Sequence, residues 1–466
     1  MFRSIILAVC LCLVNMEANA AGLDGQSMNP MWGLPFIGIL FSISLGPLLF
    51  SRIWHRYYGL IGAGWSLAVL IPMMILQGAD VTLPLLFHTL ALEYLPFILM
   101  LFALFTAAGG IVIQGNLHGS PVTNTALLTI GSLLASVIGT TAAAMILIRP
   151  LIRANDNRAH NAHVIIFFIF LVGNIGGALS PLGDPPLFLG FLRGVDFFWP
   201  VQHLWQQTFL SIGVLLVMFF GLDLFHYRRE GIKPLDPTPD DPLRLSGSLN
   251  LLLIAIAICA IVMSGVWKPD INVHIFGTRL ELPALLRDGA MVLVGIASLH
   301  FTDKSLRRSN GFEWEPIIEV AKLFAAIFVC IIPVMAMLQA GSHGPFAPLV
   351  SLVTKTDGGH DVLGYFWLTG LLSSFLDNAP TYLVFFEMAG GSPLELMTKS
   401  APTLAAISLG AVFMGANTYI GNAPNFMIYA IARRADVGMP SFFAYMVWSA
   451  LILLPLFALI SFVFLA

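Results

Sequence analysis

Long apolar runs follow one another along almost the whole chain, and short polar segments separate them. A helix needs about 20 apolar residues to cross the hydrocarbon core of a bilayer. The runs long enough to span or half-span it are centred on residues 32–50, 59–77, 84–113, 123–148, 163–190, 204–225, 249–266, 289–301, 317–338, 362–386, 402–431 and 440–466. This pattern predicts an all-α polytopic membrane protein with about ten to twelve spans.

Two stretches of the chain carry the same motif, residues 136–186 and residues 374–424. In the first block of the motif, Thr140 falls on Asn378 when the two stretches are superposed. In the second block, Gly177, Ser180, Gly183, Asp184 and Pro186 fall on Gly415, Thr418, Gly421, Asn422 and Pro424. Interrupted helices at corresponding positions of two halves are the best sequence indication of a secondary transporter's binding site at the membrane midplane.

The composition predicts that lipid is the main solvent and partner of this chain. Hydrophobic residues make up 58% of it and charged residues 10%, against roughly 25% charged residues in an average soluble domain. The net charge of −3 gives no basis for nucleic-acid binding. The four cysteines lie in apolar runs and form neither a disulfide framework nor a metal-ligand spacing.

The first twenty residues have the pattern of a signal peptide. Arg3 gives a positive start, residues 4–14 form a short apolar core, and Ala18-Asn19-Ala20 is a small-residue cleavage site. An additional first span is the alternative, although eleven apolar residues are too few to cross a bilayer. Removal of residues 1–20 would leave the mature N-terminus outside the cytoplasm.

The rest of the chain divides into two halves, residues 21–227 with the first repeat and residues 249–466 with the second. A polar, proline-rich linker over residues 228–248 separates them. Clusters of Arg and Lys mark cytoplasmic loops, and we expect five such loops. They carry Arg52/Arg56, Arg149/Arg153/Arg158, Arg228/Arg229/Lys233, Lys304/Arg307/Arg308 and Arg433/Arg434.

Corresponding loops of the two repeats differ in charge. Arg149 and Arg153 follow the first block of repeat 1, whereas no cation follows that block in repeat 2 until Lys399. After the second block the difference in charge is reversed. Repeat 2 now has the cationic loop, because Arg433-Arg434 follows Asn422. We therefore expect an inverted structural repeat about a pseudo-two-fold axis in the membrane plane.

This sidedness is consistent only if residues 123–148 and residues 362–386 each enter and leave the membrane on one face. Each stretch is then a re-entrant helical hairpin, and the turns are Gly139-Thr140-Thr141 and Asp377-Asn378-Ala379-Pro380. The second block of each repeat predicts a broken helix, because Pro185 and Pro424 prevent a continuous one. Non-helical backbone at this depth must be buried in protein or line a watery cavity.

The breaks supply the candidate ion- or substrate-binding residues. Unpaired carbonyls of a broken helix coordinate cations, and its free amides favour anions. Packing of Ser and Thr at helix interfaces is the alternative, but it does not explain why whole blocks recur at one spacing. The candidates are Ser136, Thr140, Thr141, Asn174, Ser180, Gly183, Asp184, Ser374, Asp377, Asn378, Thr381, Asn417, Thr418, Gly421 and Asn422.

Asp184 and Asp377 are the sharpest single candidates. A carboxylate at membrane depth costs at least ~2.5–3.5 kcal/mol, so it indicates a functional site by default. The alternative is an N-cap, because each aspartate precedes a proline near the start of a helix. Together with Thr140 and Asn378, the two aspartates are our candidate sodium ligands.

These motifs resemble those of the ion transporter superfamily. The resemblance rests on residues 173–186, residues 373–381 and residues 415–425, and it extends over roughly residues 60–466. That group includes arsenite permeases, citrate/metal–proton symporters, dicarboxylate/sodium symporters and D-type sodium/proton antiporters. The resemblance implies elevator-type movement, a homodimer and a place in the bacterial cytoplasmic (inner) membrane. It also implies sodium ligands at Ser136, Thr140, Thr141, Gly183, Ser374, Asn378 and Gly421.

The sequence departs from the dicarboxylate branch at both hairpin tips. That branch carries a Ser-Asn-Thr triplet, whereas this chain has Gly139-Thr140-Thr141 and Asp377-Asn378-Ala379. The stretch 180–184 is closer to the sodium/proton antiporter branch. The departure weakens an assignment to dicarboxylate transport.

Two transport functions remain open. The first is sodium (or lithium):proton antiport by alternating access, in which small cations and protons are the ligands. The second is proton- or sodium-coupled symport of a citrate-like organic anion, although no Arg or Lys lies inside the four motifs to bind one. We expect no enzyme, because no nucleophile–base pair is present, and no cofactor apart from a transported or coupling sodium ion.

Overall fold

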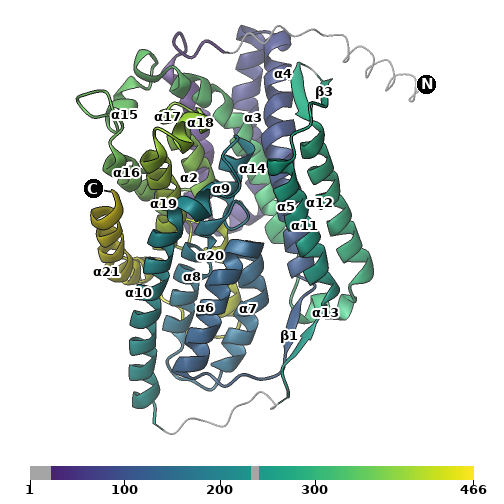
Figure 1. Cartoon of the computed structure of the whole chain (residues 1–466), viewed down its shortest axis with the longest axis vertical. Helices are drawn as coiled ribbons and strands as arrows, with labels where there is room; N and C mark the ends of the chain where they lie inside the picture. The colour runs from purple at the N-terminus through teal and green to yellow at the C-terminus, as the bar shows by residue number, and fades with distance from the viewer. Residues whose placement is uncertain (1–22, 232–240, 276, 466) are drawn as a thin grey trace. The chain divides into compact units, whose positions relative to one another are not determined.

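The computed structural model describes residues 23–231, 241–275 and 277–465. The predicted signal peptide and the middle of the predicted linker lie outside these residues. Among the described residues, ten helices are long and apolar enough to cross a membrane. The prediction of an all-α polytopic membrane protein is confirmed (Figure 1).

The chain folds into two compact units, and each takes segments from both sequence halves. Unit 1 comprises Met1–Leu101, Cys259–Val292 and Ile317–Ser351, and unit 2 comprises Phe102–Ile258, Leu293–Pro316 and Leu352–Ala466. The division between the two compact units therefore does not coincide with the predicted linker at residues 228–248. The division into two sequence halves stays a prediction about the repeat.

Unit 1 is built from helices and one hairpin of strands. Its elements are η1 (Pro30–Gly33), α2 (Leu34–Leu49), α3 (Ser51–Leu76), α4 (Ala79–Thr89), the π-helical turn η2 (Leu90–Tyr94), β3 (Asn272–Ile275), β4 (Thr278–Glu281), η4 (Gly341–His343) and α15 (Ala347–Ser351). Among the described elements, four helices cross between the units: α5 (Leu95–Ala108), α11 (Leu249–Val266), α12 (Leu282–Phe301) and α14 (Glu315–Gln339).

In unit 1, α3 packs against α14 through polar as well as apolar contacts. The indole of Trp54 donates to Glu319 Oε1 at 3.1 Å, and Phe97 of α5 stacks on Phe324 of α14 at 4.7 Å between ring centroids. The ammonium of Lys322 lies 5.2 Å from the ring centre of Tyr58. These contacts satisfy the charged groups of α14 inside unit 1.

Unit 2 contains all the predicted site residues. Its elements are β1 (Val112–Gln114), α6 (Pro121–Ile138), α7 (Thr140–Ala154), α8 (Ala162–Leu171), η3 (Ile175–Leu179), α9 (Pro185–Leu192), α10 (Trp199–Arg229), β2 (Arg244–Ser246), α13 (Lys304–Ser309), α16 (Val362–Phe375), α17 (Asn378–Met388), α18 (Pro393–Met397), α19 (Ala401–Met414), η5 (Gly415–Asn417), α20 (Ala423–Arg434), α21 (Phe442–Ile460) and the π-helical turn η6 (Ser461–Leu465). Helix α11 (Leu249–Val266) begins here and ends in unit 1.

The strands are short and do not form a larger sheet. β1 pairs antiparallel with β2, with Val112 opposite Ser246 and Gln114 opposite Arg244. β3 pairs antiparallel with β4. They connect helices rather than build a core.

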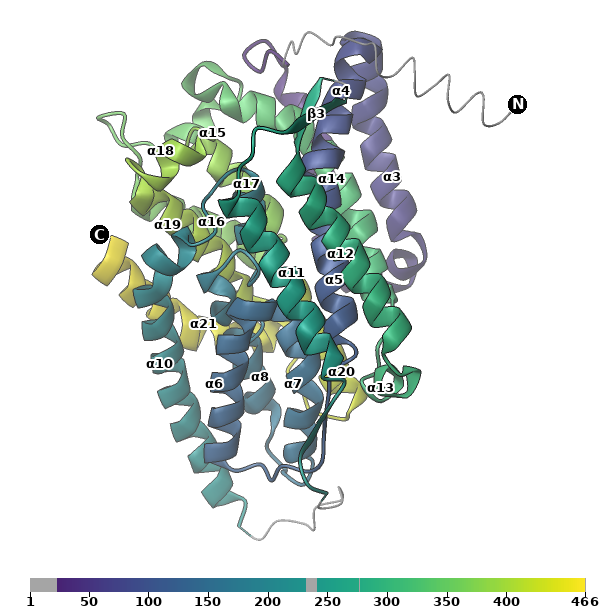
Figure 2. The same cartoon turned by 45° about the vertical axis from the view of Figure 1, so that its right-hand side comes forward.

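The core of unit 2 lies around α8 and α19, which occupy corresponding places in the two repeats. Every residue of α8 from His163 to Leu171 is buried, and so is every residue of α19 from Thr403 to Met414. Helices α6, α7, α8 and α10 lie side by side in both Figure 1 and Figure 2. The two broken helices therefore run through the middle of the unit.

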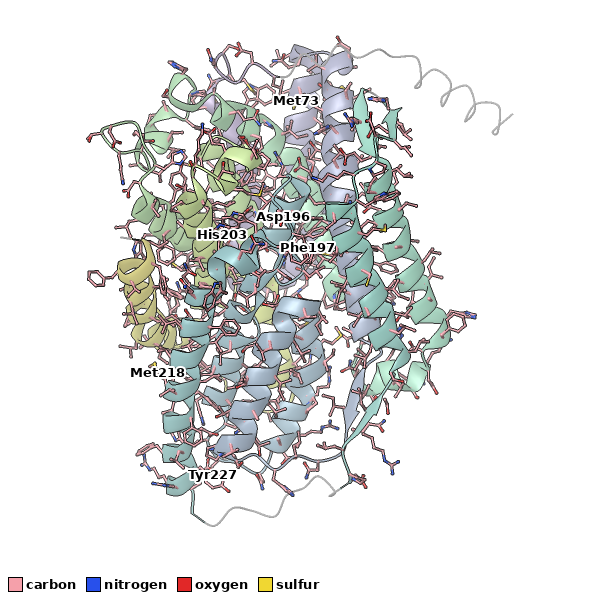
Figure 3. The ribbon with its side chains drawn as sticks, viewed as in Figure 1. Met73, Asp196, Phe197, His203, Met218 and Tyr227 are labelled. Atoms are coloured by element: carbon pink, nitrogen blue, oxygen red, sulfur yellow. The ribbon has the colours of Figure 1, made fainter. Side chains whose placement is uncertain are left out.

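Helix α10 is the longest in the structure's described part, with 31 residues. At about 1.5 Å per residue it exceeds the thickness of a bilayer core, so its last turns reach the aqueous boundary or the helix tilts. Just before it, the Asp196 carboxylate accepts from the backbone N–H of Phe198 at 2.8 Å. Figure 3 labels Asp196 and His203 near the start of α10 and Tyr227 near its end.

Candidate functional site

Each repeat holds a pair of helices joined by a sharp break. In repeat 1, α6 ends and α7 begins at Gly139, whose φ of 95° and ψ of 146° suit glycine and strain other residues. In repeat 2, α16 and α17 are joined by Leu376 and Asp377 in extended conformation. Each break includes the first residue of a predicted turn, Gly139 or Asp377, whereas the remaining residues of both predicted turns belong to α7 and α17.

The second block of each repeat also interrupts a helix. In repeat 1 the chain leaves η3 through an extended Ser180 and enters α9 at Pro185, and in repeat 2 it leaves η5 through an extended Thr418 and enters α20 at Ala423, followed by Pro424. Proline at the first turn costs the helix nothing, because the missing N–H has no intrahelical acceptor there.

Hydrogen bonds at the two breaks correspond residue by residue. The Ser136 hydroxyl donates to the Gly176 carbonyl, and the Ser374 hydroxyl donates to the Met414 carbonyl at 3.0 Å. Next to them, the hydroxyls of Ser180 and Thr418 donate to the backbone carbonyls of these two serines. In each repeat, two of the predicted site residues thus hold the first break against the second.

Close backbone approach explains the glycines of the second block. A methyl group on Gly183 would overlap the Gly177 carbonyl, and one on Gly421 would lie 2.6 Å from the Gly415 oxygen. The Gly183 carbonyl in turn accepts from the backbone N–H of Thr140 at 2.8 Å. Both predicted glycines therefore act through their backbone.

Asp184 is the centre of the polar site. Its Oδ1 accepts from the Thr140 hydroxyl at 3.1 Å and from the Asn422 amide at 3.0 Å, and its Oδ2 accepts from the Asn378 amide at 2.5 Å. Only 1% of Asp184 is exposed. Donors from both repeats therefore converge on a single carboxylate.

No positive charge balances this carboxylate. Within residues 23–231, 241–275 and 277–465, no Lys, Arg or His side chain forms an ion pair with Asp184, and its three donors are neutral. A buried charge without a counter-ion is expensive, and neutral hydrogen bonds offset only part of the cost. Binding of a small cation or of a proton would remove the unbalanced charge.

The N-cap alternative separates the two aspartates. Asp184 occupies the N-cap position of α9, but its side chain makes no capping bond. Asp377 caps α17, because its Oδ1 accepts from the backbone N–H of Ala379 at 3.1 Å, while its carbonyl accepts from the Thr381 hydroxyl at 2.9 Å.

Buried amides extend the site behind Asp184. The Asn422 amide also donates to Asn174 Oδ1 at 3.1 Å, and the Asn174 amide donates to Asn425 Oδ1 at 2.7 Å. Asn425 was missing from our candidates, because the residue at its place in repeat 1 is Leu187. Superposing the two repeats does not mark a polar residue that occurs in only one of them.

Among the described candidate residues, two buried amide oxygens have no hydrogen-bond donor, Asn378 Oδ1 and Asn417 Oδ1. The Nδ2 of Asn417 donates to the Ser374 hydroxyl at 2.9 Å. Buried acceptors are satisfied in the great majority of cases, so such exceptions require an explanation. Asn378 Oδ1 belongs to a side chain that contacts Asp184, where a cation could use it.

The structure does not bring every predicted residue to Asp184. Thr140, Asn378 and Asn422 contact its carboxylate, and Gly183 precedes it. Thr141 is half-buried and Thr381 bonds back to its own helix. Among the described residues, no group of three or more His, Cys, Asp or Glu side chains is arranged to hold a metal ion.

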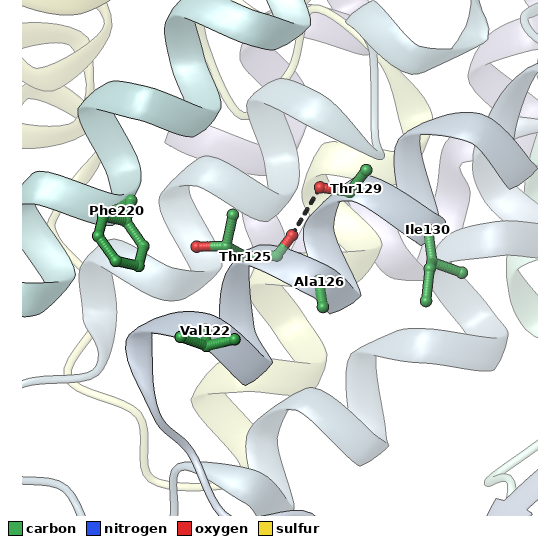
Figure 4. Close-up of a pocket in the computed structure, with 6 residues that line it drawn as sticks. All are labelled: Val122, Thr125, Ala126, Thr129, Ile130 and Phe220. Atoms are coloured by element: carbon green, nitrogen blue, oxygen red, sulfur yellow. Dashed lines mark hydrogen bonds between the residues drawn. The ribbon is translucent and has the colours of Figure 1, made fainter.

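A groove of about 400 Å³ between α6 and α10 is unrelated to this site. Val122, Ile130 and Phe220 line it, and the hydroxyl of Thr129 donates back to the Thr125 carbonyl at 2.8 Å (Figure 4). Since the polar groups of its wall are satisfied within α6, the groove has the character of a lipid-facing surface.

A further buried carboxylate, that of Asp223 in α10, was not among the predicted site residues. Its Oδ1 lies 2.5 Å from Arg158 Nη1 and 2.8 Å from His163 Nε2, and its Oδ2 accepts from the Asn124 amide at 2.9 Å. Asp223 lies near the polar end of an apolar run, so the sequence alone did not indicate that its carboxylate is buried. It joins α6, α8, α10 and the segment after α7.

Ten membrane-length helices, with helix breaks around a buried carboxylate, define the class as a multi-pass membrane transporter. A sequence profile of the family described as "Putative citrate transport" matches residues 25–465. The chain belongs to this family.

Relatives of the chain carry names of the same class. It is 27% identical over 337 residues to an "Uncharacterized transporter" of Mycobacterium bovis (strain ATCC BAA-935 / AF2122/97), and equally to one of Mycobacterium tuberculosis (strain ATCC 25618 / H37Rv). The matches cover 68% of this chain and 71% of each relative. A "46 kDa membrane protein" of Mycobacterium leprae (strain TN) is 25% identical over 335 residues, with the same coverage. These names point to transport rather than catalysis.

Proposed function

We propose that the protein is a sodium (or lithium):proton antiporter, and that Asp184 binds the two cations in turn. The observation that carries this proposal is the unbalanced charge of Asp184, which is buried among neutral donors from both repeats. A single carboxylate cannot hold a proton and a sodium ion together. Loading with one cation therefore requires release of the other.

The side chains around Asp184 suit both loaded states. The Thr140 hydroxyl can donate to a carboxylate or offer a lone pair to a cation. Half a turn of the Asn378 amide exchanges Nδ2 for Oδ1, the oxygen that has no donor. With sodium, Asp184, Thr140 and Asn378 supply oxygen ligands. With a proton, the acid donates a hydrogen bond to one of these oxygens.

Alternating access would follow from movement of the hairpins and broken helices together. In support, the Ser136–Ser180 and Ser374–Thr418 contacts join each hairpin tip to its facing break, so the site residues of unit 2 can move as one body. The inverted repeat, the elevator movement and a homodimer in the inner membrane belong to this proposal. Cys residues introduced near Arg153 and near Gly391 should label from opposite sides of the membrane, and labelling from one side contradicts the inversion.

Coupled transport of a citrate-like anion is the second candidate, because the family description names citrate. The anion would meet the carboxylate of Asp184 with no Arg or Lys in the motifs to balance it. It would therefore need a cation at Asp184, which makes cation binding common to both candidates.

Acid-loaded proteoliposomes with purified protein distinguish the two functions. Sodium or lithium added outside should dissipate the pH gradient, and citrate alone should not. If citrate moves with sodium or protons, and sodium alone leaves the gradient intact, the anion symporter is the correct function.

A further inference from the structure

A cationic pocket of about 370 Å³ lies in unit 2, apart from the residues that surround Asp184. Arg149 and Arg153 of α7 line it, together with Arg434 of α20, Ser309 at the end of α13, and Gln114 of β1. Figure 2 labels α7, α13 and α20, and Figure 1 labels β1. The volume is within the range of small-ligand sites, about 300–1,000 Å³.

The pocket joins basic residues that are far apart in the sequence. Arg149 and Arg153 lie in the last turns of α7, after the first block of repeat 1, and Arg434 ends α20, after the second block of repeat 2. The positive-inside rule assigns both helix ends to the cytoplasmic side. Only the folded structure shows that these three arginines line the same pocket.

Local contacts hold the arginines in place without neutralising them. Arg153 Nη2 donates to the Ile113 carbonyl at 2.6 Å, while its buried Nε has no acceptor. The Arg149 guanidinium packs against Gly311, where a methyl group would overlap it. A backbone carbonyl orients a guanidinium but carries no full negative charge.

The described lining of the pocket contains no acidic group. No Asp or Glu is among the residues of the described part of the chain that line it. Glu313 lies 3.6 Å from Arg434, but both side chains are mostly exposed, 56% and 73%, so water screens this pair. Three guanidinium groups therefore face a cavity with one screened carboxylate beside it.

We propose that this pocket binds a phosphate group, and that an anionic phospholipid of the cytoplasmic leaflet supplies it. Guanidinium groups bind phosphate oxygens in bidentate geometry. Ile146, Ile152 and Ile431 form an apolar wall beside the arginines, as the boundary between a headgroup and an acyl chain requires. Basic pockets between helices on this side of a membrane are suited to such headgroups.

A bound phosphate would connect the two repeats. Helix α7 is the second half of the repeat 1 hairpin, and α20 is the second half of the repeat 2 broken helix. Their first residues, Thr140 and Ala423, lie at or next to the Asp184 site. An anion held by Arg149 and Arg434 would therefore link the far ends of the two helices that also meet around Asp184.

Native mass spectrometry of the full chain tests this site. The protein is taken from bilayers of phosphatidylcholine with phosphatidylglycerol, and from phosphatidylcholine alone. We expect selective retention of phosphatidylglycerol by the wild type and about fivefold weaker retention for each pocket arginine removed. Arg149→Gln/Arg434→Gln is the test variant. Arg433→Gln is the matched control for the single variant Arg434→Gln, because it removes one positive charge from the same helix outside the pocket.

Each result decides the proposal. Arg434→Gln alone gives the test if the double variant does not fold, since this exposed side chain contributes little to the interior. If inorganic phosphate binds with the same dependence on the variants and phosphatidylglycerol does not, the site holds and free phosphate is its source. Equal retention by the pocket variants and Arg433→Gln, or no binding of either probe, overturns it.

Discussion

Two buried aspartates of unit 2 have opposite surroundings. Asp223 is fully buried, and Arg158 and His163 contact its carboxylate. Asp184 is 1% exposed, and only neutral donors contact it. The two carboxylates are buried to the same degree, but positively charged side chains contact only that of Asp223.

This difference distinguishes a carboxylate that stabilises the fold from one that can bind a cation or a proton. A paired carboxylate inside a protein keeps its charge and ties the elements that bear its partners. A carboxylate among neutral donors gains from any cation that reaches it, so its occupancy depends on the cation and proton concentrations outside. The comparison predicts that removing Asp223 damages the fold and removing Asp184 damages transport.

The largest expected effect is that of Asp184→Asn. Asparagine keeps the size of the side chain but cannot carry a proton or a full negative charge. We expect a folded protein whose sodium-driven proton movement in proteoliposomes falls to the level of empty vesicles. Sodium-driven proton exchange with an unchanged pH profile would show that Asp184 serves as a helix cap. It would also contradict the proposed difference between Asp184 and Asp223.

Asp223→Asn should have the next largest effect, on stability. It removes the nearer of the two carboxylates that pair with Arg158 and leaves Glu230 at 3.3 Å, so the cost should lie below the roughly 3–5 kcal/mol of a buried pair that is broken outright. Thermal unfolding of the purified protein measures the loss. The double variant Arg158→Gln/Asp223→Asn should recover part of it, because neither charge remains. An unaltered unfolding temperature for Asp223→Asn would show that the pair does not hold the fold.

Thr140→Ala and Asn378→Ala should weaken sodium binding about tenfold each, because each removes one hydrogen bond or ligand to a charged group. The sodium concentration for half-maximal exchange measures the effect. Thr141→Ala is the control, since its neighbour Thr140 contacts Asp184 and Thr141 does not. Equal sodium affinity in all three variants would assign Thr140 and Asn378 to helix packing.

Asp377→Asn should have the smallest effect, less than about twofold on exchange, because asparagine caps a helix as well as aspartate does. Asp377→Ala should lose roughly 1 kcal/mol of stability through the missing cap. A loss of proton coupling in Asp377→Asn as large as that in Asp184→Asn would give the site two titrating acids.

The repeat in the sequence predicted much of the fold and the breaks. Recurrence of serine, glycine and proline at one spacing located the helix breaks at Gly139, Asp377, Asp184 and Asn422, because those residue types act through local backbone geometry. The sequence also supplied Asp184 and its donors Thr140, Asn378 and Asn422 as candidates.

Long-range packing explains what the sequence could not supply. Which aspartate caps a helix and which gathers donors depends on distances between segments some 200 residues apart, as for Asn378 and Asp184. Asn425 and Asp223 have no polar counterpart or motif to mark them. Their partners become visible only when α8, α10 and α20 are packed.

Proton release on sodium binding to the purified protein tests the central claim most directly. Calorimetric titrations in buffers of different ionisation enthalpy, at one pH where the free protein binds protons, count the protons released per sodium ion. The wild type should release close to one proton, and Asp184→Asn should release none. Sodium binding without proton release in the wild type, or equal release by Asp184→Asn, would contradict exchange at Asp184.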